Sequence, residues 1–196
     1  MTSDPVSQKD AAAVDIRPAT AADAQAIAEI SVHGWQTAYR GILPDDFLAG
    51  LSVGPREVAW RMRLEHDTDA GSPAWIAQRN GRPIGFLSSG PPRDKDLQRR
   101  ARAAGRRSAG STTTIEVYAV YVDPASWRSG AGRALLTTAV DYWRARDVTR
   151  LVLWVLEGNA GGRAFYEAMG WRPDGTRQVV ELGGFTAPEV RYCLTS

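Results

Sequence analysis

Two glycines follow a stretch that favours a β-strand. The run from Tyr118 to Val122 is rich in Tyr and Val, and Pro124 should end the strand because proline cannot donate to a sheet ladder. Gly130 and Gly132 then permit a tight turn, and the residues after them favour a helix. Such a turn presents free main-chain N–H groups at the positive end of a helix dipole, which suits a phosphate group.

Two arginines beside this turn add positive charge to it. Arg128 and Arg133 flank the glycines and could form charge-assisted bonds to a phosphate. Other phosphate-binding patterns do not fit, because Leu135 stands where the dinucleotide fingerprint has its third glycine. The Gly-Lys-Ser/Thr ending of the mononucleotide loop is also absent. On spacing alone, a tight connection without a ligand stays open as the alternative.

The elements that position this turn can be read from hydrophobic periodicity. Strands are expected over 14–17, 75–79, 84–88, 112–122, 151–156, 177–182 and 190–194, and helices over about 20–35, 45–49, 56–65, 132–146 and 159–169. Asn80-Gly81 is a strong hairpin signal between two of these strands. The order predicts an α/β fold with a mixed, mostly antiparallel sheet flanked by helices on both faces.

The composition is that of one ordinary globular domain. The chain has 196 residues, of which 43% are hydrophobic and 23% charged, and a net charge of +2 does not indicate a nucleic-acid partner. One Cys excludes an internal disulfide, and with two His it makes no spaced metal cluster, so no metal is expected. Without a secretory leader or a membrane-spanning run, we expect a cytoplasmic protein with no membrane partner.

The domain is expected to span residues 13–196, behind a flexible tail over residues 1–12. Segment 90–111 should be an insertion in it, with seven basic residues against two acidic ones. Such a run is usually a solvated loop or a short exposed helix. The alternatives are a lid, an electrostatic guide for an anionic cofactor, or a nucleic-acid-binding segment.

The glycine turn resembles the acyl-CoA-binding motif of the GNAT superfamily of N-acyltransferases, Gln/Arg-x-x-Gly-x-Gly/Ala. The two motif glycines fall on Gly130 and Gly132, and Trp127 stands at the Gln/Arg position. The resemblance implies that main-chain amides here bind the pyrophosphate of coenzyme A. The residues expected at this site are Val120, Tyr121, Val122, Arg128, Ser129, Gly130, Ala131, Gly132, Arg133 and Ala134.

A second segment, 155–171, resembles the GNAT pattern Asn-x-x-Ala/x-Arg-x-Phe-Tyr-x-x-x-Gly-Phe, with Trp171 in place of the final Phe. Asn159 and Tyr166 are two helical turns apart and share one face. The resemblance implies that Asn159 hydrogen-bonds the pantetheine arm and that Tyr166 protonates the departing thiolate. Alternatively, Asn159 is a plain N-cap and Tyr166 a core aromatic.

Acyl transfer to an amine needs a base, because an alkyl ammonium has a pKa near about 10. Glu116 is the best candidate, since it lies on the strand before the turn; a surface salt bridge is the alternative. The resemblance implies that an N–H group of Val120 or Val122 polarises the acyl carbonyl. Trp35 and Tyr39, with His33 as a further candidate, are expected to line the acceptor site.

The resemblance covers nearly the whole chain and implies a GNAT-like N-acetyltransferase. We expect it to move an acetyl group from acetyl-CoA to a primary amine by direct attack in a ternary complex. Cys193 has no adjacent His or Asp, so an acyl-cysteine route is not expected. The alternative is a catalytically silent acyl-CoA-binding or regulatory module, which would need neither Glu116 nor Tyr166. Dimers are common in the family, so a homodimer is a further expectation.

Overall fold

The sheet of this protein has seven strands in the order β1-β2-β3-β4-β5-β7-β6. The computed structural model describes residues 13–66, 71–94, 96–99 and 114–195. All neighbouring strands are antiparallel except β4 and β5, which are parallel. The strands are β1 Asp15–Pro18, β2 Ala74–Arg79, β3 Arg82–Gly90, β4 Thr114–Val122, β5 Arg150–Leu156, β6 Arg172–Leu182 and β7 Phe185–Thr195. The predicted mixed, mostly antiparallel sheet is confirmed.

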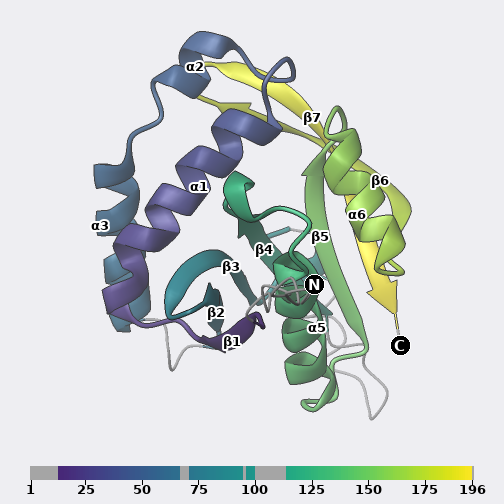
Figure 1. Cartoon of the computed structure of the whole chain (residues 1–196). Coiled ribbons are helices and arrows are strands. Elements are labelled where there is room, and N and C mark those ends of the chain that lie inside the picture. Colours follow the sequence, from purple (N-terminus) through teal and green to yellow (C-terminus); the bar gives the residue numbers. More distant parts are fainter. Residues whose placement is uncertain (1–12, 67–70, 95, 100–113, 196) are drawn as a thin grey trace, which may run out of the picture.

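Helices cover both faces of the sheet (Figure 1). They are the 3₁₀ turns η1 Ala21–Asp23 and η2 Pro124–Ser126, and the α-helices α1 Ala24–Ala38, α2 Asp45–Ala49, α3 Val53–His66, α5 Ala131–Arg144 and α6 Ala160–Ala168. On one face, Ile27 of α1 and Leu64 of α3 share a core with Phe86 of β3. On the other face, α5 buries the whole stripe that periodicity predicted, from Leu135 to Trp143.

The predicted elements occur, with several of their ends moved. The closing hairpin is longer than expected: β6 and β7 run through Pro173, Gly175 and Pro188, which argued against strand. Pro173 and Gly175 are tolerated because β6 is an edge strand whose pairing with β7 shifts register after Pro173. Pro188 is tolerated because the pairing of β7 with β5 ends at the pair Leu156–Glu189, one residue before it. Helix α3 begins at Val53 rather than at residue 56, since a proline fits its first turn.

Helix α1 lies unusually close to β4. A Cβ atom on Gly34 would be 3.1 Å from the Tyr121 ring, so a larger residue at this position would require the ring or the helix to move by a few tenths of an ångström. Helix α1 continues past Gly34 to Ala38. The role of Gly34 is therefore to permit close packing.

Part of the basic segment is packed against the sheet. Residues 95 and 100–111 of this segment, and the expected tail over 1–12, lie outside the described residues. Within its described start, Leu97 is buried and the Gln98 N–H donates to the Asp94 carbonyl at 2.9 Å. Residues 96–99 form a short helix of which Leu97 alone is buried, so the described start fits the short exposed helix of the two expected forms. Across the described ranges, no helix is long and apolar enough to cross a bilayer.

Candidate active site

The turn before α5 has the strained backbone that its glycines suggested. Gly130 is the N-cap of α5 with φ +87°, and Arg128 also has a positive φ of +62°. The first helical N–H that finds an intrahelical acceptor is that of Ala134, which donates to the Gly130 carbonyl at 2.9 Å. The N–H groups of Gly132 and Arg133 lie in the first turn, where α-helical geometry offers no acceptor. They are therefore available to an anion at the positive end of the helix dipole.

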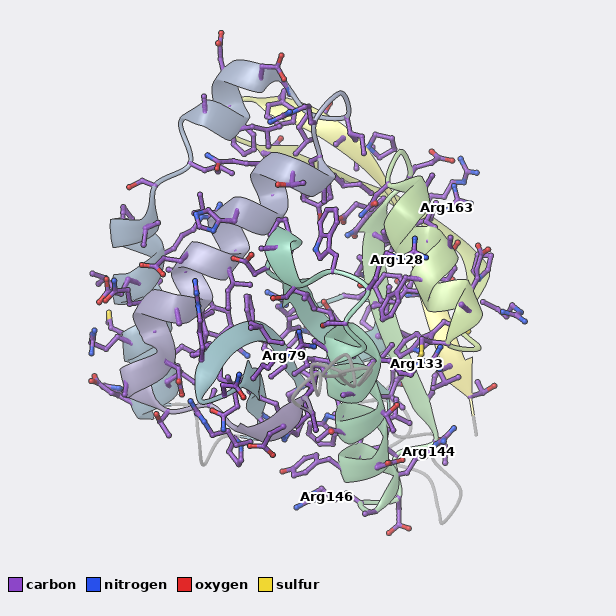
Figure 2. All side chains as sticks on the ribbon, in the orientation of Figure 1. Arg79, Arg128, Arg133, Arg144, Arg146 and Arg163 are labelled. Carbon is purple, nitrogen blue, oxygen red and sulfur yellow. The ribbon has the colours of Figure 1, made fainter. Side chains whose placement is uncertain are left out.

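Positive side chains stand beside this turn. Figure 2 places Arg128 and Arg133 near the amino-terminal end of α5, whereas Arg144 and Arg146 lie at its other end. Within the described part of the chain, neither Arg128 nor Arg133 forms a salt bridge with a carboxylate. Both guanidinium groups are thus free to contact phosphate oxygens.

Strands β4 and β5 separate next to the turn. Their pairing ends at Val117 and Leu153, although both strands continue. The Asp123 N–H donates to the Ile84 carbonyl of β3. In an antiparallel ladder, the main-chain groups of successive residues point to opposite sides of the strand. The N–H and C=O groups of Val120 and Val122 therefore point away from β3, toward the opening. The opening thus presents main-chain polar groups that no neighbouring strand pairs.

Trp127 occupies the position where the acyl-CoA motif has Gln or Arg. Its side chain is 46% exposed, and its indole N–H donates to the Val122 carbonyl at 2.8 Å. The indole therefore holds the end of β4 against the turn. By the same ladder alternation, the main-chain groups of Tyr121 point to β3, so only its side chain can face a ligand.

Glu116 is a buried carboxylate beside the opening. Its Oε2 accepts the Arg93 N–H at 2.7 Å, and its Oε1 lies 3.5 Å from Arg93 Nε. Burial raises the pKa of Glu116, and the hydrogen bond from Arg93 offsets part of that rise. The β3–β4 register shifts at Ser88 and Ser89, which leaves Tyr118 as an extra, unpaired residue beyond Glu116. A carboxylate in this setting can accept a proton near neutral pH.

Helix α6 carries Asn159 and Tyr166. The Asn159 side chain accepts the Gly162 N–H at 2.9 Å, so it is an N-cap. A Cβ on Gly162 would lie 2.6 Å from Asn159 Nδ2, which explains the unusual glycine in this turn. Tyr166 is half-buried, and burial together with the nearby Tyr121 raises its pKa. Its phenol therefore stays protonated at neutral pH and can donate a proton or a hydrogen bond.

A second wall of the site comes from α1 and from the β6–β7 hairpin. The Trp35 and Tyr39 rings meet edge to face at 5.0 Å, and the Tyr39 and Tyr121 hydroxyl oxygens lie 3.3 Å apart. His33 does not join this wall; its Nδ1 lies 3.4 Å from Asp123 Oδ2 on the exposed surface. The hairpin contributes Gln178, Val180, Leu182 and Glu189, which we call the hairpin wall.

These features surround one cavity of about 1480 Å³. Its lining contains Glu116, Tyr166, Asn159, Trp35 and Tyr39, together with Val120, Tyr121, Val122 and residues 128–133. Ala134, which was also expected at the cofactor site, is not among the residues that line the cavity, and its N–H donates to the Gly130 carbonyl within the helix.

Several lining residues were not foreseen from the sequence. Arg93 and Asp94 come from the start of the basic segment, and Glu189 comes from β7. Asp94 is held in place by the buried Arg191, whose Nη1 donates to its carboxylate at 2.7 Å while Nε donates to Asp174 at 2.9 Å. The sequence carried no signal for these contacts, because each joins residues far apart in the chain.

The sequence and the fold of this chain are those of a known enzyme family. Residues 35–171 match the sequence pattern described as the acetyltransferase (GNAT) family. The chain belongs to the GNAT family, as its two motifs implied, and is an N-acetyltransferase.

Individual relatives agree over nearly the full chain. The probable N-acetyltransferase Rv2775 of Mycobacterium tuberculosis is 30% identical over 185 residues, which cover 92% of this chain and 93% of the relative. The PaiA N-acetyltransferase of Thermoplasma acidophilum, solved in complex with coenzyme A, superposes with a TM-score of 0.70 at 15% identity, covering 94% of this chain and 99% of PaiA. YncA of Salmonella typhimurium, solved with acetyl-CoA, has a TM-score of 0.64 and 25% identity, covering 93% and 94% of the two chains.

Proposed function

We propose that this N-acetyltransferase takes its acetyl group from acetyl-CoA and passes it to a primary amine by direct attack within a ternary complex. One observation carries the proposal: the amino-terminal turn of α5, the buried Glu116 and the protonated Tyr166 all line a single cavity. The turn would bind the acyl donor, Glu116 would act as the base and Tyr166 would act as the acid.

The part of the cavity beside α5 has the positive charge and the main-chain N–H groups that would bind coenzyme A. The first-turn amides of α5, with Arg128 and Arg133, would hold the pyrophosphate. The main-chain N–H groups of Val120 and Val122 would face the pantetheine arm and the acyl carbonyl oxygen. PaiA and YncA, which share the fold, were solved with coenzyme A and acetyl-CoA, respectively.

Glu116 and Tyr166 would then handle the protons of the reaction. Glu116 accepts the proton of the acceptor ammonium, directly or through water, so that the nitrogen lone pair attacks the thioester carbon. A C–N bond forms, the C–S bond breaks with its electron pair on sulfur, and Tyr166 donates its proton to the thiolate. The nitrogen then releases its second proton to the Tyr166 phenolate, directly or through water, which leaves a neutral amide and restores the phenol. Cys193 is not among the described residues that line the cavity, which favours attack by the amine itself.

A test of this function combines acetyl-CoA with a panel of primary amines and follows the release of free thiol. Tyr166→Phe should lower kcat by about tenfold or more while the Kd of coenzyme A stays within about twofold, because only the proton donor is lost. The matched control is Tyr142→Phe, since Tyr142 packs on Trp75 and Arg146 away from the cavity.

The outcomes separate the two expected functions. Unchanged turnover in Tyr166→Phe would remove the acid role from this residue. Coenzyme A binding without thiol release, for every amine in the panel, would instead favour a silent acyl-CoA-binding module.

A further inference from the structure

One carboxylate in the cavity, that of Glu189, forms no salt bridge within the part of the chain that the structure describes. Glu189 of β7 is half-buried and accepts a hydrogen bond from the neutral Gln178 amide at 2.8 Å. No Arg, Lys or His lies within salt-bridge distance of it in the described ranges. The other two acidic residues in the lining differ, because Glu116 pairs with Arg93 and Asp94 pairs with Arg191.

The surroundings of Glu189 make this lack of a counter-charge unfavourable. Burial raises the pKa of Glu189, and the negative charge of Glu116 raises it further, while Gln178 and Arg93 act in the opposite direction. A carboxylate removed from water is stabilised strongly by a cation placed against it. The hairpin wall therefore favours a positive group on whatever fills the cavity beside it.

Glu189 and Glu116 belong to different walls of the cavity. Glu116 lies on β4, where the strands separate, while Glu189 pairs with Leu156 at the far end of β5. Apolar and aromatic side chains line the cavity on the Glu189 side, including Trp35, Ile42, Val180 and Leu182. The arrangement offers an apolar surface for an aliphatic chain, with a carboxylate at each wall.

The two carboxylates cannot both serve the reacting nitrogen equally well. That nitrogen must lose its proton before attack, and a second carboxylate against it would stabilise the unreactive ammonium. A separate positive group at Glu189 leaves the reacting nitrogen to Glu116.

Resting on the proposed function, we infer that the acceptor is a primary amine that carries a second positive charge, held by Glu189 while the reacting amine lies near Glu116. Aliphatic diamines are the simplest members of this class. Glu189 is then a specificity-determining residue, and the chain between the two nitrogens packs on the apolar side chains of the second wall.

The test compares 1,5-diaminopentane with 1-aminopentane, which differ in the second cationic group. In the wild type, kcat/KM should favour the diamine by about tenfold or more, the size of a charge-assisted hydrogen bond. Glu189→Gln should bring the two amines to within about twofold and leave the KM of acetyl-CoA unchanged. Glu181→Gln is the matched control, because this exposed β6 residue lies outside the lining and loses the same charge.

The binding of both amines to the enzyme–coenzyme A complex, measured by calorimetry, gives a second readout that does not depend on turnover. Equal kcat/KM values for the two amines in the wild type, or a preference that persists in Glu189→Gln, would overturn the inference and leave the proposed function standing. Tighter diamine binding that Glu189→Gln abolishes, without any thiol release, would support the cation site and overturn the proposed transfer.

Discussion

Replacing Gly130 with alanine tests the anion-binding turn directly. Gly130 has φ +87°, and a Cβ built there would meet no atom within 4 Å. Gly130→Ala therefore introduces backbone strain without a steric clash. Gly81 provides a matched control, since it has φ +74°, an equally open Cβ position and a place in the β2–β3 hairpin, outside the cavity lining.

The magnitude follows from the backbone conformation. A residue with a Cβ atom in the left-handed region costs about 1–2 kcal/mol. In a domain of this size, the full strain lowers Tm by about 2–8 °C, as expected for Gly81→Ala, whose turn is held by the paired Arg79 and Arg82. Because a Cβ on Gly130 would meet no atom within 4 Å, the free turn in Gly130→Ala can relax, and its Tm falls by less. Coenzyme A must restore the turn on binding, so the strain relieved in the free enzyme reappears as a Kd up to about 5- to 30-fold higher.

The assay is thermal unfolding of each variant together with calorimetric titration of coenzyme A. Gly81→Ala should have a lower Tm and the wild-type Kd, whereas Gly130→Ala should have a smaller decrease in Tm and a higher Kd. If Gly130→Ala shows the smaller decrease in Tm and still binds coenzyme A like the wild type, the amides of this turn do not hold the cofactor.

Two further substitutions test the buried charges. Glu116→Gln should lower kcat by about 100-fold or more. The Tm of the variant minus the Tm of the wild type should increase as pH rises from 4 to 7. The sign follows from the raised pKa of Glu116: protonation of this carboxyl stabilises the fold at low pH, and that stability is lost as pH rises through the raised value. The control is Glu181→Gln, whose Tm relative to the wild type should not change with pH in this way. A Tm difference between Glu116→Gln and the wild type that stays constant from pH 4 to 7 would contradict this account. Arg191→Met leaves the partly buried Asp94 carboxylate without its partner, while Asp174 keeps its ion pair with Arg150. The variant should lose about 3–5 kcal/mol of unfolding free energy, which thermal unfolding would report as a Tm lower by about 6 °C or more. Arg177→Met, which breaks a surface pair with Glu157, should stay within about 1 kcal/mol, and equal losses would show that burial is not the cause.

Local patterns in the sequence predicted much of the fold and half of the site. The stripe from Leu135 to Trp143 repeats at helical spacing, and α5 buries it as expected. Gly130 was identifiable because a strand, a proline and a helix-forming run surround it, and such a turn requires a positive φ. These features depend on residues close together in the chain.

Long-range contacts were not predictable from those patterns. The register shift at Tyr118 arises from pairing with β3, and no residue type marks it in β4. Glu189 follows Pro188, which argued against a strand, so its place in the cavity depends on how far β7 continues. Arg191 stood in an expected strand, yet its partner Asp94 is 97 positions away.

The separation of β4 and β5 has a mechanical consequence. Among the described residues, four residue pairs, from Thr114–Arg150 to Val117–Leu153, join the amino-terminal half of the sheet to its carboxy-terminal half. A cosubstrate bound in the opening between β4 and β5 would contact both halves of the sheet and stabilise their association. Molecules without the cosubstrate should open there first, so the supply of acyl donor would also set how long each copy of the enzyme survives proteolysis.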